Sequence, residues 1–423
     1  MTYTDLEHID HRVRLHAIGR AGRDLSPSDP ERLLALMRPR FADPHAQVRW
    51  AAALALGDAA AYHPQLVLTA LADWAQTAAG GDDRDNRRAH IAVLAALGRA
   101  GRRLAGVPRR ELGEGWSRAC SAALEACGAP GADTRFQAVA ALVRLEASDA
   151  RAHTEALARL DDDDPEVVAA AAEWLIGFGD ATVLPSLERA HQRLEGSKAG
   201  PQILLALAEL LAVASRSGEG EPWMELKARV RRSLVAEAGS LPHGLRACEA
   251  LVVLGDDSVI APLERVQRGW FTHRLIRVAT AAVLASLGHA QGLEALRRAL
   301  SHRKVDARGY AIEWAGRLGT PVLLPELLTI LNRTRDYHSD TAAYALGLLG
   351  PPHATDGLLS ALDDPRAEVR VEAARALDRH GLAAERLAAL ATDDPSADVR
   401  AAAAGLDDPL RSRVAEGDHP DNP

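Results

Sequence analysis

Apolar and small residues in the C-terminal half of the chain recur at the spacing of one helical face. One such stripe consists of Val369, Ala373, Ala374 and Leu377. A second apolar segment around Leu362 precedes it, and Pro365 separates the two, because proline ends a helix but is accepted in the first turn of the next. The pattern predicts short helices in consecutive pairs, and the small residues of the stripe let neighbouring helices approach closely.

A fixed period of 31 residues orders these helix pairs. Glycine recurs at Gly288, Gly319, Gly350 and Gly381. Arginine recurs in the same frame at Arg246, Arg277, Arg308 and Arg370, with Ser339 in the slot between the last two. Each glycine falls where a helix of about three turns would end, and glycine adopts the left-handed conformation of a helix C-terminus at the lowest cost. Such a period predicts a solenoid of stacked repeats.

The expected fold is therefore all-α, an α-solenoid (superhelix) of about eleven stacked antiparallel helix pairs over residues 1–406. Each repeat buries its apolar face on its neighbours, so one elongated domain suffices for the whole stack. The period is strongest from about residue 241 to 404, and an irregular insertion interrupts it at about residues 99–131. Residues 407–423 have little to bury, which predicts an acidic flexible tail.

Composition supports this fold and narrows the function. Hydrophobic residues make up 47% of the chain but aromatic residues only 4%, as expected when Ala, Leu and Val fill the core. The net charge of −8 disfavours nucleic-acid binding, which needs a basic footprint. Three cysteines make no disulfide framework. Without a secretory pattern or an apolar stretch that could span a bilayer, we expect a soluble cytoplasmic protein with no membrane association.

The helix-pair pattern also carries a family resemblance. One segment resembles the HEAT repeats and their short variant in phycobilin lyase subunits. The residues that carry the resemblance are Asp364, Pro365, Val369, Arg370, Ala373, Ala374 and Leu377. The same pattern returns as Asp394, Pro395, Val399 and Arg400, and as Asp43, Pro44, Val48 and Arg49. The resemblance implies that the Asp and Arg residues form a polar ladder between successive repeats. It also implies that the second helix of each pair lines a concave side.

One face of these second helices is unusually rich in aromatic and charged residues. In the repeat at Arg308, the residues on it are Tyr310, Glu313, Trp314 and Arg317, away from the alanines that face the core. Aromatic and Arg residues gathered on one surface are typical of a binding hot spot. The predicted binding residues are Tyr310, Glu313, Trp314, Tyr337, Tyr344 and Arg375, together with the earlier pair Glu173 and Trp174. The alternative is that Trp314 belongs to the core and that the charges only solvate a helix face.

The same face is apolar in the two preceding repeats. The positions there are Cys248, Leu251, Val252, Ala279, Ala282 and Val283. If they face outward, the centre of the groove is hydrophobic and suits an amphipathic helix or an apolar ligand. If other residues cover them, they are core.

The sequence favours a non-catalytic interaction module that binds a protein or peptide partner on its concave face, with no cofactor and no metal. The alternative is an enzyme or accessory subunit that holds a small molecule or modified peptide in the groove, as the lyase resemblance implies. Its acid/base candidates are Glu313, Asp336, His338 and Asp340. A third hypothesis, the HEAT-like DNA glycosylases, has no matching motif here. No HExxH, phosphate-binding glycine loop or GxSxG sequence occurs.

Overall fold

The computed structural model describes residues 3–81, 83–217, 221–241, 243–333 and 337–405, so the predicted tail at 407–423 lies outside the described residues. Within those ranges the chain is helical and has no strands, with 23 α-helices and six short 3-10 helices. Helices α2 to α23 form eleven consecutive pairs, which confirms the predicted α-solenoid. Contacts divide the chain into two compact units, Met1–Met224 and Glu225–Pro423. Among the described helices, none combines the length and the apolar character needed to cross a bilayer.

Unit 1 begins with helix α1 and continues with five helix pairs. Its helices are α1 (His11–Leu25), α2 (Pro30–Met37), α3 (Ala46–Ala59), α4 (Pro64–Ala79), α5 (Arg84–Arg103), α6 (Arg109–Ala126), α7 (Ala132–Arg144), α8 (Ala150–Arg159), α9 (Pro165–Ile176), α10 (Leu184–Arg193) and α11 (Gly200–Arg216). The second helices α3, α5, α7, α9 and α11 pack on one another in succession. The predicted insertion at 99–131 contains the end of α5 and helix α6, which packs on α4 and α7 as the first helix of a pair.

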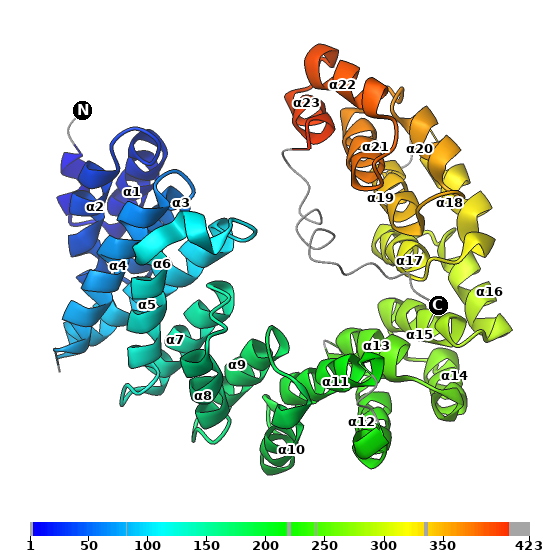
Figure 1. Cartoon of the computed structure of the whole chain (residues 1–423), viewed down its shortest axis with the longest axis horizontal. Helices are drawn as coiled ribbons and strands as arrows, with labels where there is room; N and C mark the ends of the chain where they lie inside the picture. Colours follow the sequence, from blue (N-terminus) through cyan, green and yellow to red (C-terminus); the bar gives the residue numbers. More distant parts are fainter. Residues whose placement is uncertain (1–2, 82, 218–220, 242, 334–336, 406–423) are drawn as a thin grey trace. The chain divides into compact units, whose positions relative to one another are not determined.

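Unit 2 contains six further pairs. Its helices are α12 (Met224–Glu237), α13 (His243–Leu254), α14 (Ile260–Arg268), α15 (Arg274–Ser286), α16 (Ala290–Ala299), α17 (Val305–Arg317), α18 (Leu324–Leu331), α19 (Ser339–Leu349), α20 (Thr355–Ala361), α21 (Ala367–Arg379), α22 (Ala384–Asp393) and α23 (Ala397–Ala403). The second helices α13, α15, α17, α19, α21 and α23 again pack on one another in succession. Within unit 2, Figure 1 shows α16, α18 and α20 along the outer side of this second-helix layer.

The 31-residue frame fixes where the second helices of unit 2 begin and end. Helices α13, α15, α17 and α21 each start three residues before the frame arginine, at His243, Arg274, Val305 and Ala367. The four frame glycines follow these helices or α19 with positive φ angles, +75° at Gly288, +59° at Gly319, +71° at Gly350 and +65° at Gly381. The predicted left-handed caps are therefore present, in a conformation that other residues adopt only with strain.

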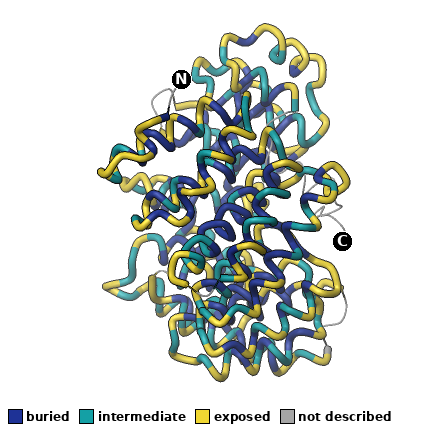
Figure 2. The backbone as a smooth tube through the Cα atoms, turned by 90° about the vertical axis from the view of Figure 1, so that its left-hand side faces the viewer, coloured by how far each residue is buried: buried dark blue, intermediate teal, exposed yellow. Residues whose placement is uncertain are grey.

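Small residues bring the second helices close together. The predicted stripe is buried, since Val369, Ala373, Ala374 and Leu377 are each at most 1% exposed. Gly316 of α17 lies so near α19 that a Cβ atom there would be 2.7 Å from the Cα atom of Ala345. In Figure 2 the buried segments run along the helices, while the exposed segments are mostly at their ends. The three cysteines are all buried and unpaired.

The predicted polar ladder links consecutive second helices. Arg370 of α21 donates from Nε and Nη2 to both carboxylate oxygens of Asp394, at 2.8 and 2.9 Å. Its Nη1 donates to the carbonyl oxygen of Asp364 at 2.8 Å, at the start of its own repeat. Two further ladder pairs have the same geometry, Arg14 with Asp43 and Arg135 with Asp162. In each pair the aspartate lies six residues before the frame position of the next repeat, so the ladder repeats with the fold.

Each ladder aspartate also caps its own turn. The Oδ1 atom of Asp394 accepts the backbone N–H of Ser396 at 2.8 Å, and that of Asp43 accepts the N–H of His45 at 2.8 Å. The hydrogen bond from Arg370 is the main reason that the pKa of Asp394 lies below its ordinary value of 3.8. The aspartate is therefore charged at neutral pH and joins two repeats through one side chain.

Asp394→Asn tests the ladder, because an asparagine keeps the turn cap but loses the charge. We expect local opening of α22 and α23 to become easier by roughly 2 to 3 kcal/mol at pH 7, as measured by hydrogen exchange of their amides. Because the folded-state pKa is lowered, the wild-type advantage is present above pH 3.8 and is lost as the pH falls through the lower folded-state value.

The matched control is Asp393→Asn, which is the same substitution at the exposed neighbouring residue. It should leave exchange in α22 and α23 unchanged. Equal effects of the two substitutions at pH 7 would show that the ladder pair does not hold the last repeat.

Candidate functional site

The aromatic residues predicted on α17 form a compact group with one charged side chain. The indole of Trp314 is buried, with 3% of the residue exposed, and the ring of Tyr310 meets it edge-on with 6.1 Å between ring centroids. The guanidinium of Arg317 lies 5.5 Å from the centroid of the indole. Arg317 also reaches Glu249 on α13, with 3.2 Å between Nη1 and Oε1. Because α15 packs between α13 and α17, this ion pair passes over a face of α15.

Two polar atoms of this group are buried side by side. The hydroxyl oxygen of Tyr310 and the indole nitrogen of Trp314 are both inaccessible to solvent, and neither makes a hydrogen bond of good geometry within the described residues. Burial raises the pKa of Tyr310 to about 12, while the indole N–H of Trp314 beside the phenol oxygen opposes this rise. The indole therefore faces the phenol oxygen, and the phenol O–H is the donor that lacks an acceptor among the described residues.

The next two second helices continue the stripe with charged residues and a tyrosine. Tyr344 of α19 and Glu313 of α17 are half-buried. On α21, Arg375 donates to Glu372 at 2.7 Å. Burial is the main reason that the pKa of Glu372 is raised, and the nearby carboxylate of Asp340 on α19 adds to the effect while Arg375 opposes it. Since α17, α19 and α21 pack side by side, these residues form one surface of unit 2.

The acid/base candidates His338 and Asp340 make different contacts in the structure. His338 is buried, and its Nε2 atom lies 2.8 Å from the carbonyl oxygen of Val305, to which it donates. A Cβ atom on Gly309 of α17 would lie 2.7 Å from the His338 ring, so the imidazole fills the space that this glycine leaves. Asp340 lies in the first turn of α19, and its Oδ1 atom accepts the N–H of Thr341. His338 therefore has a packing role. Asp336 lies outside the described residues.

The remaining predicted residues lie apart from this surface. Tyr337 is 82% exposed in the segment before α19. Glu173 and Trp174 belong to α9 in unit 1, where Glu173 is exposed. Trp174 is 2% exposed and donates its indole N–H to the carbonyl oxygen of Ala147 at 2.8 Å. Trp174 is thus a satisfied core residue, unlike Trp314.

The apolar positions of the preceding repeats belong to the core. Cys248, Leu251, Ala279, Ala282 and Val283 are all 0% exposed, and Val252 is half-buried against the core. For these positions the structure therefore supports the core interpretation and not the open hydrophobic groove. Helix α15 is buried on nearly every side, because α13, α14, α16 and α17 all pack against it.

Comparison with known proteins agrees with this architecture. Residues 324–406 match the family described as HEAT repeats. This part of the chain consists of HEAT repeats. Yeast importin-β (Kap95p) is similar in structure, with a TM-score of 0.59 and 12% sequence identity over 97% of this chain and 55% of the importin chain. This chain thus spans about half of importin-β, and the similarity shows an α-solenoid fold.

Two further solved structures are similar with lower TM-scores. The CpcE–CpcF complex of phycocyanin lyase from Nostoc sp. PCC7120 has a TM-score of 0.41 and 15% identity over 61% of this chain and 93% of the other. Kap121p has a TM-score of 0.44 and 14% identity over 95% of this chain and 51% of the other. No curated protein sequence matches the chain significantly.

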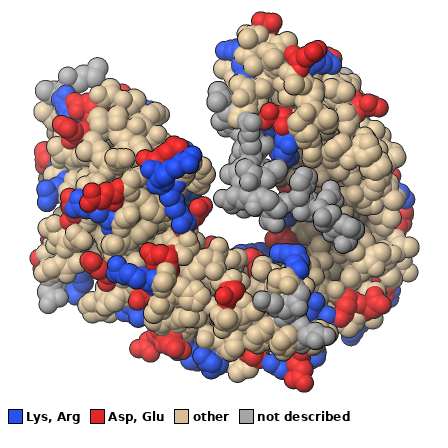
Figure 3. Space-filling view, in the orientation of Figure 1, with Lys and Arg blue, Asp and Glu red and all other residues tan. Residues whose placement is uncertain are grey.

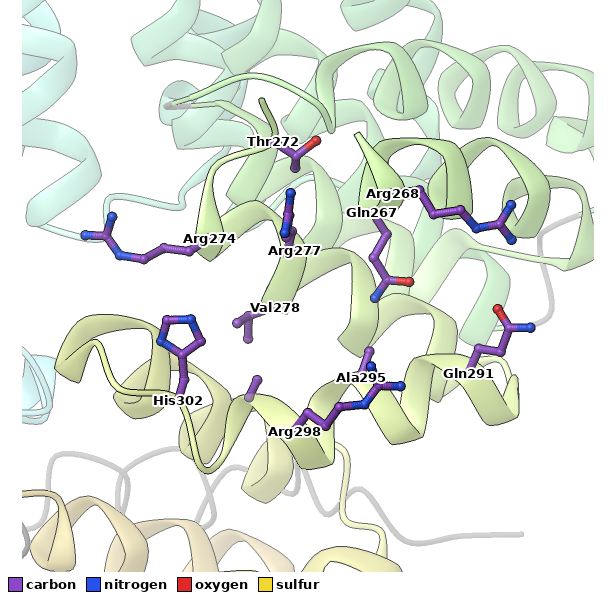
Figure 4. A pocket seen from close by; sticks show the side chains of 11 residues that line it. Gln267, Arg268, Thr272, Arg274, Arg277, Val278, Gln291, Ala295, Arg298 and His302 are labelled. Carbon is purple, nitrogen blue, oxygen red and sulfur yellow. The ribbon is translucent and has the colours of Figure 1, made fainter. Parts of the chain in front are cut away.

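One cavity next to the HEAT repeats was not predicted from the sequence. It has a volume of about 680 Å³ and lies between α14, α15 and α16. Figure 4 shows Arg274 and Arg277 on one side of the opening, with Arg298 and His302 on the other. A sequence signal for it exists, because His302 occupies the position of the ladder aspartate, six residues before Arg308.

The burial of Trp314 predicts unequal effects of two aromatic substitutions. Trp314→Ala should lower the free energy of unfolding by about 3 to 5 kcal/mol, because it leaves a large cavity between packed helices. Tyr337→Ala should change it by no more than about 0.5 kcal/mol, because the ring is exposed. Urea denaturation followed by circular dichroism measures both. A Trp314→Ala protein as stable as the wild type would contradict the buried position of the indole.

Proposed function

We propose that this protein is a non-catalytic interaction module whose second-helix layer in unit 2 binds a protein or peptide partner. The observation that carries the proposal is the half-buried phenol of Tyr310, whose O–H has no acceptor among the described residues. An extended peptide offers carbonyl oxygens that accept a hydrogen bond from a phenol. Once the Tyr310 side chain turns toward the partner, binding would satisfy the one donor that the free protein leaves without an acceptor.

The residues around this phenol support the same function. Glu313 and Tyr344 are half-buried, and Glu313 makes no ion pair within the described residues. Tyrosine offers a large rigid surface with one polar group, which suits a binding hot spot. Arg375 and Glu372 contribute charge on the next helix, which favours a partner segment of mixed polarity. Basic and acidic side chains are interspersed on the face of the molecule shown in Figure 3. The net charge of −8 suits a protein partner better than a nucleic acid.

No observation on the described residues favours catalysis. Of the acid/base candidates, His338 donates to a backbone carbonyl and fills a packing space beside Gly309. Asp340 accepts a backbone N–H in its own turn. A general base must be able to reach a substrate proton, and neither side chain is placed in an open cavity by these contacts. We therefore keep the small-molecule alternative out of the proposal.

Tyr310→Phe tests the proposal with the loss of one oxygen atom. The partner is first identified by cross-linking and mass spectrometry in the native cell, and its affinity is then measured by titration calorimetry. Because the hydroxyl has no partner in the free protein, we expect unchanged or slightly higher stability. We expect the partner to bind roughly five- to tenfold more weakly, as the loss of one buried hydrogen bond implies.

Tyr62→Phe is the matched control, since Tyr62 is 60% exposed in unit 1. It should alter neither stability nor affinity. Wild-type affinity of Tyr310→Phe for every partner that cross-links to unit 2 would refute the assignment of this surface.

A further inference from the structure

The polar ladder is incomplete between α15 and α17. In the complete pairs, a frame arginine meets an aspartate that lies six residues before the next frame position, as Arg370 meets Asp394. For Arg277 of α15, the corresponding residue is His302. No salt bridge within the described residues involves Arg277. The ladder therefore lacks a carboxylate at this position. The aspartate is also replaced after Arg246, where Phe271 occupies the corresponding position, and after Arg308, where Arg333 does.

His302 keeps one of the two roles of the ladder aspartate. Its Nδ1 atom accepts the backbone N–H of Lys304 at 3.0 Å, just as Asp394 caps the N–H of Ser396. An imidazole that accepts at Nδ1 carries its proton on Nε2, so its other nitrogen can only donate. His302 cannot accept a hydrogen bond from Arg277. The turn is preserved, but the acceptor for the arginine is not.

Arg277 consequently retains unused donors. Its Nη2 atom donates to the carbonyl oxygen of Gly269 at 2.9 Å. Its Nε and Nη1 atoms have no hydrogen-bond partner within the described residues. In Arg370, Nε and Nη2 hold the carboxylate of Asp394, while Nη1 binds backbone carbonyls. Arg277 thus uses for its own backbone the Nη2 atom with which Arg370 holds its carboxylate, and its Nε and Nη1 atoms are left to donate to a ligand.

The place of the missing carboxylate is a cavity rather than packed protein. The cavity of about 680 Å³ is within the size range of small-molecule sites. Its lining includes four arginines, Arg268, Arg274, Arg277 and Arg298, but no aspartate or glutamate. The other three arginines have carboxylate partners, namely Glu264, Asp306 and Glu294. One positive charge is therefore left over, and it belongs to Arg277.

Two exposed aromatic residues lie in the segment between α14 and α15, between two residues that line this cavity. Trp270 and Phe271 follow Arg268 and precede Thr272, both of which line it. They are 88% and 96% exposed, so nothing in the described structure covers either ring. Large exposed aromatic residues next to a cavity commonly mark a binding site, because they gain most from being covered.

We propose that this cavity is an anion site that takes a phosphate monoester, with the phosphoryl oxygens in place of the missing aspartate carboxylate and the organic group against Trp270 and Phe271. A phosphoryl group matches the fork of a guanidinium as a carboxylate does, and its additional oxygens can accept from the Nε2 atom of His302 and from neighbouring arginines. The inference is independent of the partner surface on α17, α19 and α21.

Calorimetric titration of the full chain with phenyl phosphate tests the proposal. We expect saturable binding to the wild type and roughly tenfold weaker binding to Arg277→Gln. The sharpest variant is His302→Asp, which supplies the missing carboxylate from the chain itself. It should complete the ladder, raise the melting temperature and abolish phenyl phosphate binding. The matched control His302→Asn leaves the cavity without a carboxylate and should bind within about threefold of the wild type.

Further measurements test the organic and the phosphate parts of the ligand separately. They also distinguish a peptide ligand from a free phosphate monoester. Trp270→Ala combined with Phe271→Ala should weaken phenyl phosphate but not inorganic phosphate. A phosphotyrosine peptide that binds tenfold more tightly than phenyl phosphate indicates a peptide ligand, and equal affinities indicate a free phosphate monoester. The proposal is overturned if phenyl phosphate shows no saturable binding, or if His302→Asp and His302→Asn bind it equally.

Discussion

Close packing between consecutive second helices is the constraint on which this structure depends. Each second helix meets the next through alanine and glycine, as Gly316 meets Ala345 and Gly347 meets Ala376. The first helices pack on the second helices of their own pairs and in several places also on the preceding pair, as α16 packs on α15. No large side chain fits at the points where such residues meet. The larger side chains lie elsewhere on the second helices, with Trp314 buried in the core and Tyr310, Glu313 and Tyr344 half-buried.

At the starts of the second helices, the polar ladder joins consecutive repeats. Each aspartate closes its own turn and neutralises an arginine of the preceding repeat, so one side chain fixes both the repeat and its register. The two roles can be separated by substitution, and His302 shows the result. The turn survives because imidazole can accept a backbone N–H, while the arginine loses its partner. A repeat protein can thus acquire a polar site by one change in its frame without losing its fold.

The sequence allowed the architecture to be predicted because the period acts locally. The frame arginines located the starts of α13, α15, α17 and α21, and the frame glycines located the left-handed caps of α15, α17, α19 and α21. The sequence did not decide whether Trp314 lies on the exposed face of α17 or in the core. Tyr310 and Trp314 both lie on the predicted stripe, but burial of the indole depends on how α13 and α15 pack beside α17, which no local pattern encodes. The cavity was missed for a related reason, since a histidine in an aspartate position reveals nothing until its hydrogen bonds are known.

Gly316→Ala tests the central claim most directly, because two physical effects give opposite signs. In an exposed helix, alanine is about 1 kcal/mol more favourable than glycine. At Gly316 a Cβ atom would lie 2.7 Å from the Cα atom of Ala345, so close packing predicts a lower urea midpoint for the variant. Gly19 of α1 is the control, since its nearest neighbour would be the end of the Arg23 side chain at 3.7 Å, and Gly19→Ala should raise the midpoint. A midpoint that rises equally for both variants would contradict the account.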